Sequence, residues 1–504
     1  MAIVIRYSVL LLIFIISKNS HGFETFGFDF HHRFSDPVKG VLTVDELPDK
    51  GTTQYYAVMA HRDRVIHARR LASGDDDDDQ QLTFRSGNLT VQINSLGFLH
   101  YANVSVGTPS LSFLVALDTG SDLFWVPCDC TRCVKALSTT SGRRLELNIY
   151  SPNASSTSKS IPCNSSSCGY RGECSGISTC PYQVQYLSNG TSSNGVLVED
   201  VLHLTTGGNR PKNVDAQITF GCGIVETGSF LDGAAPNGLF GLGMEKSSVP
   251  SILSTAGIAA NSFSMCFGAD GIGRINFGYK GNPDQDETPF SINQLHPTYN
   301  ISVTQITVET NKRNIDFSAI FDSGTSFTYL NDPVYTILSE SFDKYAQDKR
   351  LPSDPAVPFE FCYSVSPSGT VMVPNVTLTM KGGALYPVFD PIVVVSDESS
   401  SRYCLGIVKS SDVNIIGQNF MTGYHIVFDR EKMVLGWKQS NCYDIRASNN
   451  VRVGVPPATA AEPPIPATAA QPRTVSQNSG APPCFLGAFG LMVSLLLLTI
   501  LFFP

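Results

Sequence analysis

The chain has 504 residues, of which 42% are hydrophobic and 16% charged, so its composition is that of a globular protein with room for two or three domains. Its formal net charge is −9 and no large basic patch stands out, which argues against nucleic acid as a partner. The 42 glycines and 30 prolines, with few long amphipathic stretches, favour an all-β body.

Residues 1–22 have the pattern of a secretory signal peptide. Arg6 precedes an apolar run from Val9 to Ile16, and small and polar residues follow that run. The run is too short to span a bilayer comfortably. We therefore expect the protein to enter the secretory pathway, where the compartment is oxidising.

Residues 23–85 do not have the pattern of the β body that follows. Tyr55–Leu71 is the best helix candidate in the chain, and it is basic although the whole protein is acidic. The unbroken acidic run Asp75–Asp79 then predicts an exposed loop, where proteolytic nicking concentrates. Our hypothesis is a propeptide whose basic helix masks an acidic cleft, with cleavage between Leu71 and about Ser95.

A short motif occurs twice, about two hundred residues apart. The apolar runs Phe113–Leu117 and Ala319–Phe321 each read as a buried strand, and each is followed by Asp, a small hydroxyl residue, Gly and a second hydroxyl residue. One copy is an ordinary strand-to-turn signal. Two copies predict two carboxylates face to face, which cannot both ionise easily and therefore share a proton. The two motifs are Asp118-Thr119-Gly120-Ser121 and Asp322-Ser323-Gly324-Thr325.

A second repeated motif supports an internal duplication. Asn237–Gly243 and Asn414–Gly417 each contain two apolar residues followed by Gly, well after the Asp motif of the same half. The first is not a phosphate-binding loop, because the Lys-Ser/Thr ending is absent. The order of motifs predicts two similar β lobes, residues 97–290 and 291–445, with a central cleft and one Asp from each lobe.

The two Asp motifs, each after an apolar strand, resemble those of the pepsin-like aspartic proteases. The resemblance covers about residues 97–445 and implies a bilobal all-β fold and endopeptidase activity at acidic pH, without a metal or cofactor. It implies that Asp118 and Asp322 activate a water molecule, which attacks a polypeptide substrate bound in an extended conformation. The implied supporting residues are Thr119, Gly120, Ser323 and Gly324 in the two loops, with Ser121 and Thr325 as hydrogen-bond partners of the carboxylates.

The resemblance also bears on a hairpin in the first lobe. Pro181–Tyr186 alternates like a strand, and a turn-rich stretch separates it from a second strand, Val196–Leu204. In the resembled family a hairpin here closes over the substrate, and Tyr186 matches its tyrosine. Trp125 matches a family tryptophan behind the active site. A surface hairpin without a function is the open alternative.

The cysteines predict disulfides. The chain has thirteen, and only Cys484 lies outside the range Cys128–Cys442. The C-x-C-x2-C stretch could bind zinc, but export, the even total and the absence of His pairs favour disulfides, whose pairing the sequence does not give. The cysteine-rich insertion resembles the plant nepenthesin-like branch, in which a pair similar to Cys362 and Cys404 is bonded. The candidates are Cys128, Cys130, Cys133, Cys163, Cys168, Cys174, Cys180, Cys222, Cys266, Cys362, Cys404 and Cys442.

Further patterns concern the second lobe and the surface. Asp332–Leu338 has Pro at a helix-start position, and Phe420–Trp437 contains two strand-like runs split by a turn. The density of N-x-S/T sequons agrees with secretion. The sequons are at Asn88, Asn103, Asn153, Asn164, Asn189, Asn300 and Asn375.

The C-terminal region predicts a surface anchor. Residues 446–483 are rich in Pro, Ala, Ser and Thr, as in an extended stalk. Residues 484–504 are almost purely apolar and follow the small residues Asn478, Ser479 and Gly480, which are candidates for the attachment site of a GPI anchor. We expect a GPI-anchored protein on the outer face of the plasma membrane; a single transmembrane span is the alternative.

Together these patterns predict a monomeric aspartic endopeptidase. The rival class is a non-catalytic cell-surface binding or inhibitor-like protein on the same fold, but such relatives tend to lose one Asp motif and both are intact here. A structural wall protein explains the stalk and anchor but not the paired Asp loops.

Overall fold

The computed structural model describes residues 25–35, 38, 48–71, 83–86, 89–92, 97–138, 144–169, 174, 178–186, 190–206, 212–231, 233–268, 271–292, 297–365, 371–397, 400–440 and 442. The expected signal peptide, stalk and hydrophobic tail lie outside these residues, as do Asn88, Asn189, Cys484 and the three candidates for GPI attachment. Within the described ranges, no helix combines the length and apolar character needed to cross a membrane.

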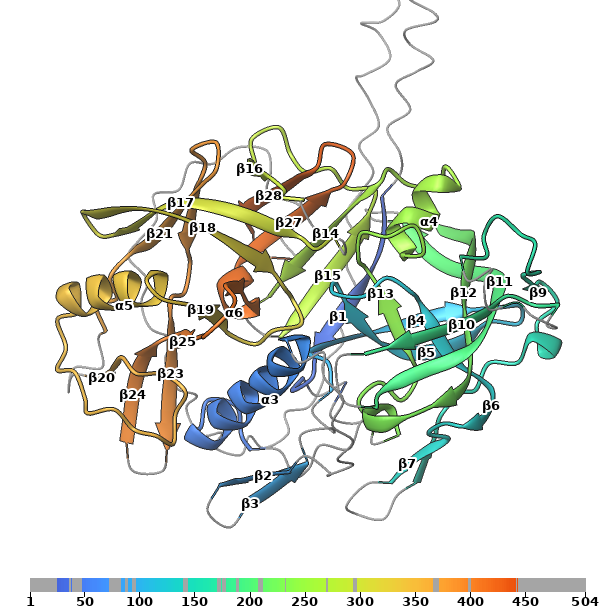
Figure 1. The fold of residues 1–504 in the computed structure, drawn as a ribbon, viewed down its shortest axis with the longest axis horizontal. Coiled ribbons are helices and arrows are strands. Elements are labelled where there is room, and N and C mark those ends of the chain that lie inside the picture. The colour runs from blue at the N-terminus through green and yellow to red at the C-terminus, as the bar shows by residue number, and fades with distance from the viewer. Residues whose placement is uncertain are drawn as a thin grey trace, which may run out of the picture. The chain divides into compact units, whose positions relative to one another are not determined.

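The largest sheet has fourteen strands and draws on both halves of the chain (Figure 1). In spatial order the main path is β10 (Pro181–Gln185), β11 (Ser192–Thr206), β12 (Asn213–Glu226), β6 (Trp125–Arg132), β13 (Leu239–Gly241), β5 (Leu111–Asp118), β4 (His100–Val106), β1 (Phe26–His32), β15 (Ile272–Phe277), β14 (Ser262–Phe267), β27 (Tyr424–Asp429), β28 (Val434–Gln439) and β16 (Asp286–Pro289), while β9 (Lys159–Ser160) pairs with β11.

A second sheet has seven strands, all from the second half of the chain. Its order is β22 (Leu385–Val388), β21 (Val376–Met380), β17 (Asn300–Val308), β18 (Asn311–Phe321), β26 (Ile415–Ile416), β19 (Thr328–Leu330) and β25 (Ile407–Lys409). A smaller sheet contains β20 (Cys362–Ser364), β24 (Ser400–Leu405) and β23 (Ile392–Asp397), and two hairpins join β2 (Thr83–Ser86) to β3 (Leu89–Gln92) and β7 (Ala136–Ser138) to β8 (Arg144–Glu146).

Helices are few in the described residues, and α3 (Thr53–Leu71) is the longest of them. The α-helices are α3 (Thr53–Leu71), α4 (Val249–Thr255), α5 (Val334–Tyr345) and α6 (Gln418–Met421), and the 3-10 turns are η2 (Pro152–Ala154) and η4 (Gly228–Phe230). The expected helix after Pro333 is α5, which buries Val334, Leu338 and Phe342 at intervals of four, on one face. The expected basic helix at residues 55–71 is α3, two residues longer at its start.

These elements confirm the all-β, bilobal pepsin-like fold. The expected closing hairpin is β27–β28, but it pairs with β14 and β16, which we assigned to the first lobe. Phe263 of β14 stacks on Phe428 of β27 with ring centroids 4.7 Å apart, and Tyr299 packs edge-on to the same Phe428 ring. The two lobes therefore share strands and one hydrophobic core at the boundary near residue 290.

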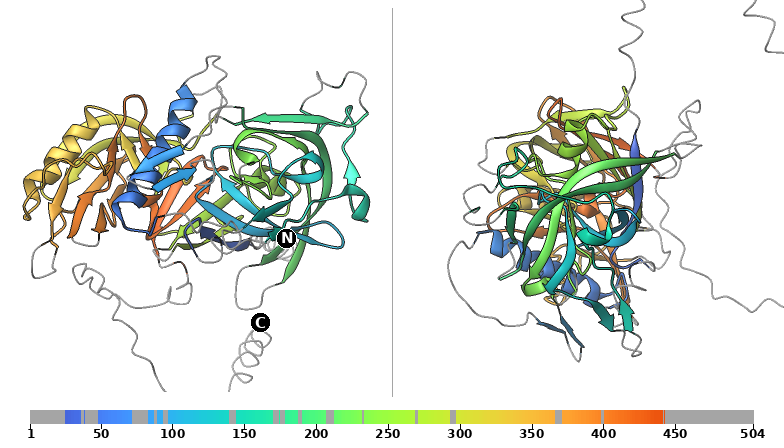
Figure 2. Two further views of the ribbon diagram at one scale, coloured as in Figure 1. Left: turned by 90° about the horizontal axis from the view of Figure 1, so that it is seen from below. Right: turned by 90° about the vertical axis from the view of Figure 1, so that its right-hand side faces the viewer.

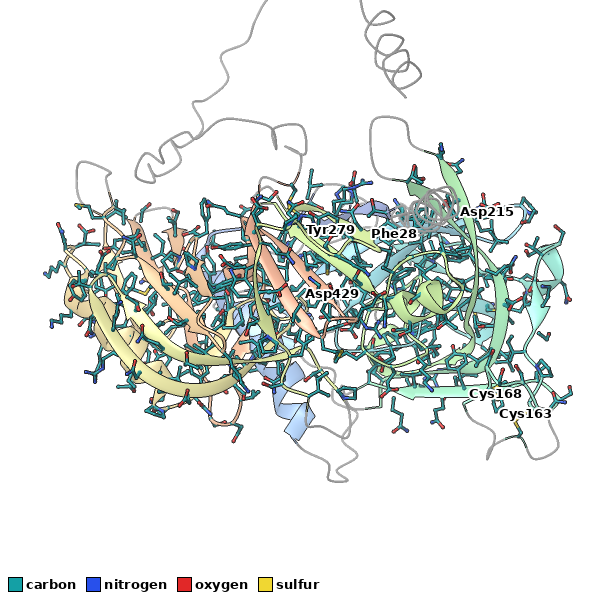
Figure 3. All side chains as sticks on the ribbon, turned by 90° about the horizontal axis from the view of Figure 1, so that it is seen from above. Phe28, Cys163, Cys168, Asp215, Tyr279 and Asp429 are labelled. Carbon is teal, nitrogen blue, oxygen red and sulfur yellow. A yellow bond between two sulfur atoms is a disulfide. The ribbon has the colours of Figure 1, made fainter. Side chains whose placement is uncertain are left out.

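Strand β1 is the main departure from expectation. From the sequence we placed residues 23–85 outside the β body, yet β1 lies between β4 and β15 in the large sheet. Phe26 and Phe30 are buried, and Phe28 packs edge-on against Phe240. The alternation Phe26, Phe28, Phe30 is a period-two pattern typical of a strand, and it was the missed signal. Figure 3 shows Phe28 beside the strands of the large sheet.

Candidate active site

The two Asp motifs occupy equivalent positions in the two lobes. Asp118 ends β5, and Asp322 directly follows β18. Each of these strands pairs in parallel with the short strand of the apolar-apolar-Gly motif: Gly241 of β13 lies opposite Asp118, and Ile416 of β26 lies opposite Phe321. The internal duplication seen in the sequence is therefore a duplication of strand pairing.

The glycines of these motifs are needed for close backbone approach. A Cβ on Gly241 would lie 2.1 Å from the backbone oxygen of Asp122, and a Cβ on Gly417 would lie 2.1 Å from that of Phe327. A side chain at either position would overlap the Asp loop of its own lobe. Both loops thus pack on a backbone that only glycine allows to come so near.

The loops from the two lobes meet at their hydroxyl residues. Thr119 Oγ1 and Ser323 Oγ lie 3.4 Å apart, and both side chains are buried. The backbone N–H of Gly120 donates to Asp118 Oδ1 at 2.9 Å, and that of Gly324 donates to Asp322 Oδ1 at 2.8 Å. Each carboxylate is therefore oriented by the glycine two residues later, and the contact between the loops brings the two motifs side by side.

The second hydroxyl residues of the motifs differ between the lobes. Thr325 Oγ1 donates to Asp322 Oδ2 at 2.7 Å, which matches the expected partnership. Ser121 Oγ is buried, but among the described residues no hydrogen bond joins it to the Asp118 carboxylate. The backbone oxygen of Ser121 accepts instead from Gly243 N–H at 2.8 Å, so this residue fixes the loop through its main chain.

Trp125 and Tyr186 are brought together beside the first loop. The indole N–H of Trp125 donates to the Tyr186 hydroxyl at 2.7 Å. Phe230 packs edge-on to both rings, with centroids 4.9 Å from Trp125 and 5.0 Å from Tyr186. Burial raises the pKa of Tyr186 well above its ordinary value, so the hydroxyl stays neutral. Tyr186 directly follows β10, and residues 187–189 at the expected hairpin tip are outside the described residues.

A further carboxyl group lies next to the first loop. Asp122 accepts a hydrogen bond from Glu245 N–H at 2.8 Å. Burial raises the pKa of Asp122, and the nearby acidic groups Glu245 and Asp118 raise it further, against the lowering effect of that hydrogen bond. A second carboxyl close to Asp118 therefore holds its proton more firmly than an exposed one.

Helix α3 reaches the second Asp loop through two buried charged residues. Arg62 donates to the Gly324 carbonyl oxygen at 3.0 Å and to the Gly97 carbonyl oxygen at 2.8 Å, and it pairs with Asp63 at 2.8 Å. Asp63 accepts from the N–H and hydroxyl of Ser326 at 3.0 and 2.9 Å. Sequence reasoning found the helix but not these contacts, because no local pattern marks a charge as buried. Figure 2 shows α3 lying between the strands of the two lobes.

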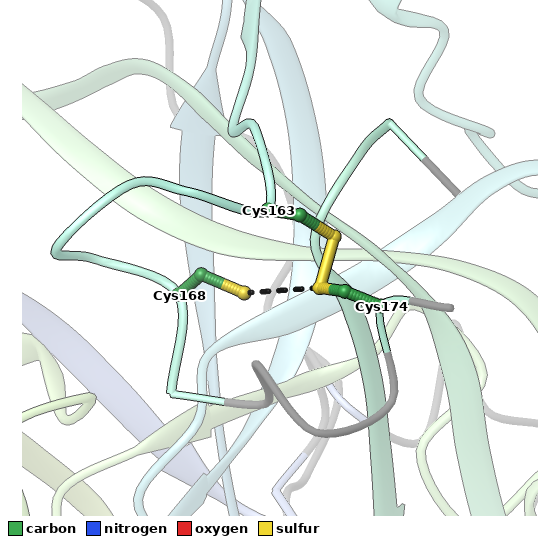
Figure 4. A group of neighbouring side chains, drawn as sticks. All are labelled: Cys163, Cys168 and Cys174. Atoms are coloured by element: carbon green, nitrogen blue, oxygen red, sulfur yellow. Dashed lines mark hydrogen bonds between the residues drawn. A yellow bond between two sulfur atoms is a disulfide. The ribbon is translucent and has the colours of Figure 1, made fainter. Parts of the chain in front are cut away.

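All twelve expected cysteines form disulfides, which confirms the prediction of disulfide bonding. The pairs are Cys128–Cys222, Cys130–Cys133, Cys163–Cys174, Cys168–Cys180, Cys266–Cys442 and Cys362–Cys404. The sulfurs of Cys163, Cys168 and Cys174 lie within 4.8 Å of one another, close enough to share a metal ion (Figure 4). Because each is already bonded to another sulfur, the group lacks the free thiolates that a metal requires.

The sequons on described residues differ in exposure. Asn103, Asn153, Asn164 and Asn375 are exposed, so a glycan has room at each of them. Asn300 is only half-exposed and lies at the start of β17, where it pairs with Ile320. It is the least accessible of the described sequons.

Known proteins resemble this chain in sequence and in structure. The family model described as "Xylanase inhibitor N-terminal" matches residues 100–279, and "Xylanase inhibitor C-terminal" matches residues 298–439. "Aspartyl protease family protein 1" of Arabidopsis thaliana is 57% identical over 473 residues, 91% of each chain. "Aspartic proteinase-like protein 1" of the same plant is 39% identical over 434 residues, 82% of this chain and 80% of the relative.

A solved structure shares the fold. The crystal structure of conglutin gamma, a basic 7S globulin from lupine seeds, has a TM-score of 0.53 and 21% identity, and the match covers 68% of this chain and 91% of that one. Identity at this level shows the fold alone. The family is shown by the relatives found by sequence, because the first of them is 57% identical over 91% of both chains. This chain belongs to the plant family of atypical pepsin-like aspartic proteases.

Proposed function

We propose that this chain is an aspartic-type endopeptidase whose catalytic residues are Asp118 and Asp322. The observation that carries the proposal is the contact between Thr119 and Ser323, whose oxygens are 3.4 Å apart. These residues directly follow the two aspartates, so the contact brings two carboxyl groups from different lobes together. Two neighbouring carboxyl groups share a proton, which supplies an acid and a base in one place.

The proposed reaction uses that shared proton. The ionised carboxylate takes a proton from a water molecule, and the water oxygen attacks the carbonyl carbon of the scissile peptide bond. The protonated carboxyl donates to the carbonyl oxygen and stabilises the negative charge that develops there. The C–N bond then breaks as the dyad passes a proton to the leaving amine. The products are a free carboxyl group and a free amine, and no metal or cofactor takes part.

The substrate in this proposal is a polypeptide in an extended conformation. Tyr186 covers the bound peptide, and its hydroxyl is held by the Trp125 indole at 2.7 Å. Thr119 and Ser323 fix the distance between the loops, while Gly120, Gly324 and Thr325 orient the carboxylates by the hydrogen bonds described above. The proposed enzyme is a monomer. It acts at acidic pH, because its rate falls once both aspartates are ionised.

The proposal includes synthesis as an inactive precursor. Residues 23–85 form the propeptide, and cleavage between Leu71 and about Ser95 produces the mature enzyme. The contacts of Arg62 and Asp63 with Gly324 and Ser326 support this, since α3 then blocks the loop that carries Asp322. Sequencing the N-terminus of the mature protein tests it, and a mature chain that begins at about Phe23 contradicts it.

We also propose that the precursor is exported, glycosylated and GPI-anchored at the outer face of the plasma membrane. The six disulfides support an oxidising compartment. The anchor rests on the tail sequence alone, which a single membrane span would also explain. A phosphatidylinositol-specific phospholipase releases the protein from intact cells in the first case and leaves it bound in the second.

Cleavage of a peptide library tests the central claim. The chain is truncated before Cys484 so that it is secreted, processed to remove residues before about Ser95, and assayed between pH 4 and pH 8 beside Asp118→Asn and Asp322→Asn. We expect acid-dependent cleavage that disappears in both variants. A rate that is flat with pH contradicts the shared proton. No cleavage by a folded, processed wild type favours the rival, a non-catalytic cell-surface binding protein.

A further inference from the structure

We propose that two buried histidines, His32 and His100, form an acid-sensitive switch that releases α3 from the second Asp loop. Only the interpretation of this release as activation of the precursor rests on the proposed function. The switch itself is a conformational event, so it can be tested without any catalytic activity.

The two histidines are direct cross-strand neighbours. His32 is the last residue of β1, and in the register of β1 with β4 it pairs with His100. Their ring centroids are 5.4 Å apart, and the residues are 8% and 3% exposed. Phe30 and Phe267 pack edge-on against the His100 ring. Two imidazoliums at this spacing would be like charges held opposite one another in an apolar site, which is destabilising.

The charges around the pair add to this effect. Those that act on the rings are basic, so they disfavour protonation of either ring. The Asp63 carboxylate is paired with Arg62, one of these basic groups, and accepts hydrogen bonds from Ser326. The basic neighbours of His32 are His100, Lys50, Arg62 and Arg33, and those of His100 include Arg62.

Aromatic contacts connect the pair to α3 and to the second loop. The His32 ring stacks on Phe34, and Phe34 packs edge-on to Tyr55 in the first turn of α3 with centroids 4.7 Å apart. The neighbouring Tyr56 ring lies 6.0 Å from that of Phe327, which belongs to the second loop. A charge on His32 therefore disturbs the aromatic packing that holds α3 in place. His100 is also within hydrogen-bonding distance of the Ser323 backbone.

The direction of the pH effect follows from burial. Burial lowers the pKa of His32 well below 6.5 and that of His100 to about 3. When α3 has moved away and water reaches the rings, both return toward the ordinary value of 6.5. The released state then binds protons that the docked state cannot. Docking is fully stable above about pH 6.5 and is lost progressively as the pH falls toward the docked values.

Hydrogen exchange of the full chain tests the switch. The Asp118→Asn variant prevents self-cleavage, and exchange of peptides from residues 53–71 is followed from pH 7.5 to pH 4, corrected for intrinsic rates. We expect the opening constant of α3 to be constant above about pH 6.5 and to rise below it, with a slope approaching two protons for two histidines. A slope of zero from pH 7.5 to pH 4 overturns the proposal, because neither histidine would then take up a proton when α3 opens.

Histidine substitutions provide the second arm of the experiment. In the same background, His32→Gln with His100→Gln removes both titrating groups, and we expect the opening midpoint to move down by about one pH unit or more. His425→Gln is the matched control. His425 lies half-buried in β27, where desolvation lowers its pKa to about 4, and its ring hydrogen-bonds with Ser264 and stacks on Tyr279.

The outcomes of the second arm are distinct. A midpoint unchanged by the double substitution, or moved equally by His425→Gln, overturns the proposal. If the double variant does not fold, the slope of the parent variant alone decides. A last measurement uses the chain with Asp118 restored. If its α3 opens with the expected pH dependence but the chain never cleaves peptide, the proposed function is contradicted and the switch is not.

Discussion

Arg62 donates to the backbone carbonyl oxygen of Gly324 at 3.0 Å, so a side chain of α3 contacts the glycine of the second Asp loop. Two residues later, the N–H of Ser326 donates to Asp63 at 3.0 Å. One acceptor and one donor of the loop are thereby occupied, and these are the two kinds of backbone group with which an extended peptide pairs. Under the proposed function, the Arg62–Asp63 pair therefore competes with a peptide substrate for the same loop.

The first prediction concerns this pair. Arg62→Ala leaves the Asp63 carboxylate buried without its counter-charge, and removing one partner of a buried pair costs about 3–5 kcal/mol. We expect the docking of α3 to weaken at neutral pH in the Asp118→Asn background. Limited proteolysis with an added protease, read by mass spectrometry, should show faster cleavage within residues 53–71.

An exposed pair provides the control for Arg62. Arg144 and Glu146 form an ion pair of 2.6 Å in which both side chains are 68% exposed. Arg144→Ala should leave cleavage within α3 unchanged, because exposed pairs contribute little. If Arg62→Ala protects α3 as well as the parent does, the buried pair does not hold the helix in place.

Comparison with the sequence shows which features had a local signal. The Asp motifs, the two apolar-apolar-Gly segments and the start of α5 were predictable because strand runs, glycine and proline mark them in the sequence. The strand β1 had its alternating phenylalanines, and we passed over them because we had placed residues 23–85 outside the body. The signal for this strand was present in the sequence, and the error was to expect no strand of the β body in these residues.

Other features had no local signal at all. Arg62 and Asp63 lie in a basic, polar helix, and their burial depends on Ser326 and Gly324, about 260 residues away in the chain. Burial of Glu226 likewise depends on how β12 packs, and carboxylates at strand ends are ordinarily exposed. The pairing of β27 with β14 across the lobe boundary requires the register of distant strands, which the sequence does not encode locally.

The second prediction concerns Glu226, at the end of β12. It is fully buried, and neither carboxyl oxygen has a hydrogen-bond partner among the described residues. Burial raises the pKa of Glu226 to about 8 from 4.5. The pKa of Glu226 is higher in the folded protein than in the unfolded chain. Its contribution to the free energy of unfolding is therefore fully present below about pH 4.5 and is lost as the pH rises to about 8.

Glu226→Gln tests this expectation. We expect the variant to gain roughly a few kcal/mol over wild type at pH 8 and to gain little at pH 4.5. Thermal unfolding at pH 4.5, 6 and 8 measures the difference, and Glu199→Gln, in a surface pair with Lys159, serves as control. A Tm difference between Glu226→Gln and wild type that does not change with pH would show that the carboxyl does not titrate in this range.

The third prediction concerns the glycine beneath the first Asp loop. In Gly241→Ala the added methyl would lie 2.1 Å from the Asp122 oxygen and 2.2 Å from its carbonyl carbon. Backbone atoms cannot move aside as a side chain can, so we expect a loss of about 3 kcal/mol or more and a displaced Asp118. Denaturant unfolding and peptide cleavage measure the two effects.

Gly169 is the matched control for Gly241. A Cβ on Gly169 meets nothing within 4 Å, so Gly169→Ala should unfold and cleave like the wild type. Equal losses in the two variants would mean that alanine is harmful for reasons unrelated to close packing. A Gly241→Ala variant with wild-type stability and activity would show that the first loop tolerates displacement.

The fourth prediction separates the Tyr186 hydroxyl from its ring. Tyr186→Phe leaves the buried Trp125 N–H without its acceptor, which costs about 1–3 kcal/mol, while packing on Phe230 is kept. If that hydroxyl positions the hairpin over the substrate, kcat/KM at acid pH should fall by about tenfold, the equivalent of 1.4 kcal/mol. Tyr182→Phe removes another hydroxyl contact of the same hairpin, 2.9 Å from Ser193, and should lower stability while leaving kcat/KM unchanged. Equal falls in kcat/KM for the two variants would reduce Tyr186 to a purely structural residue.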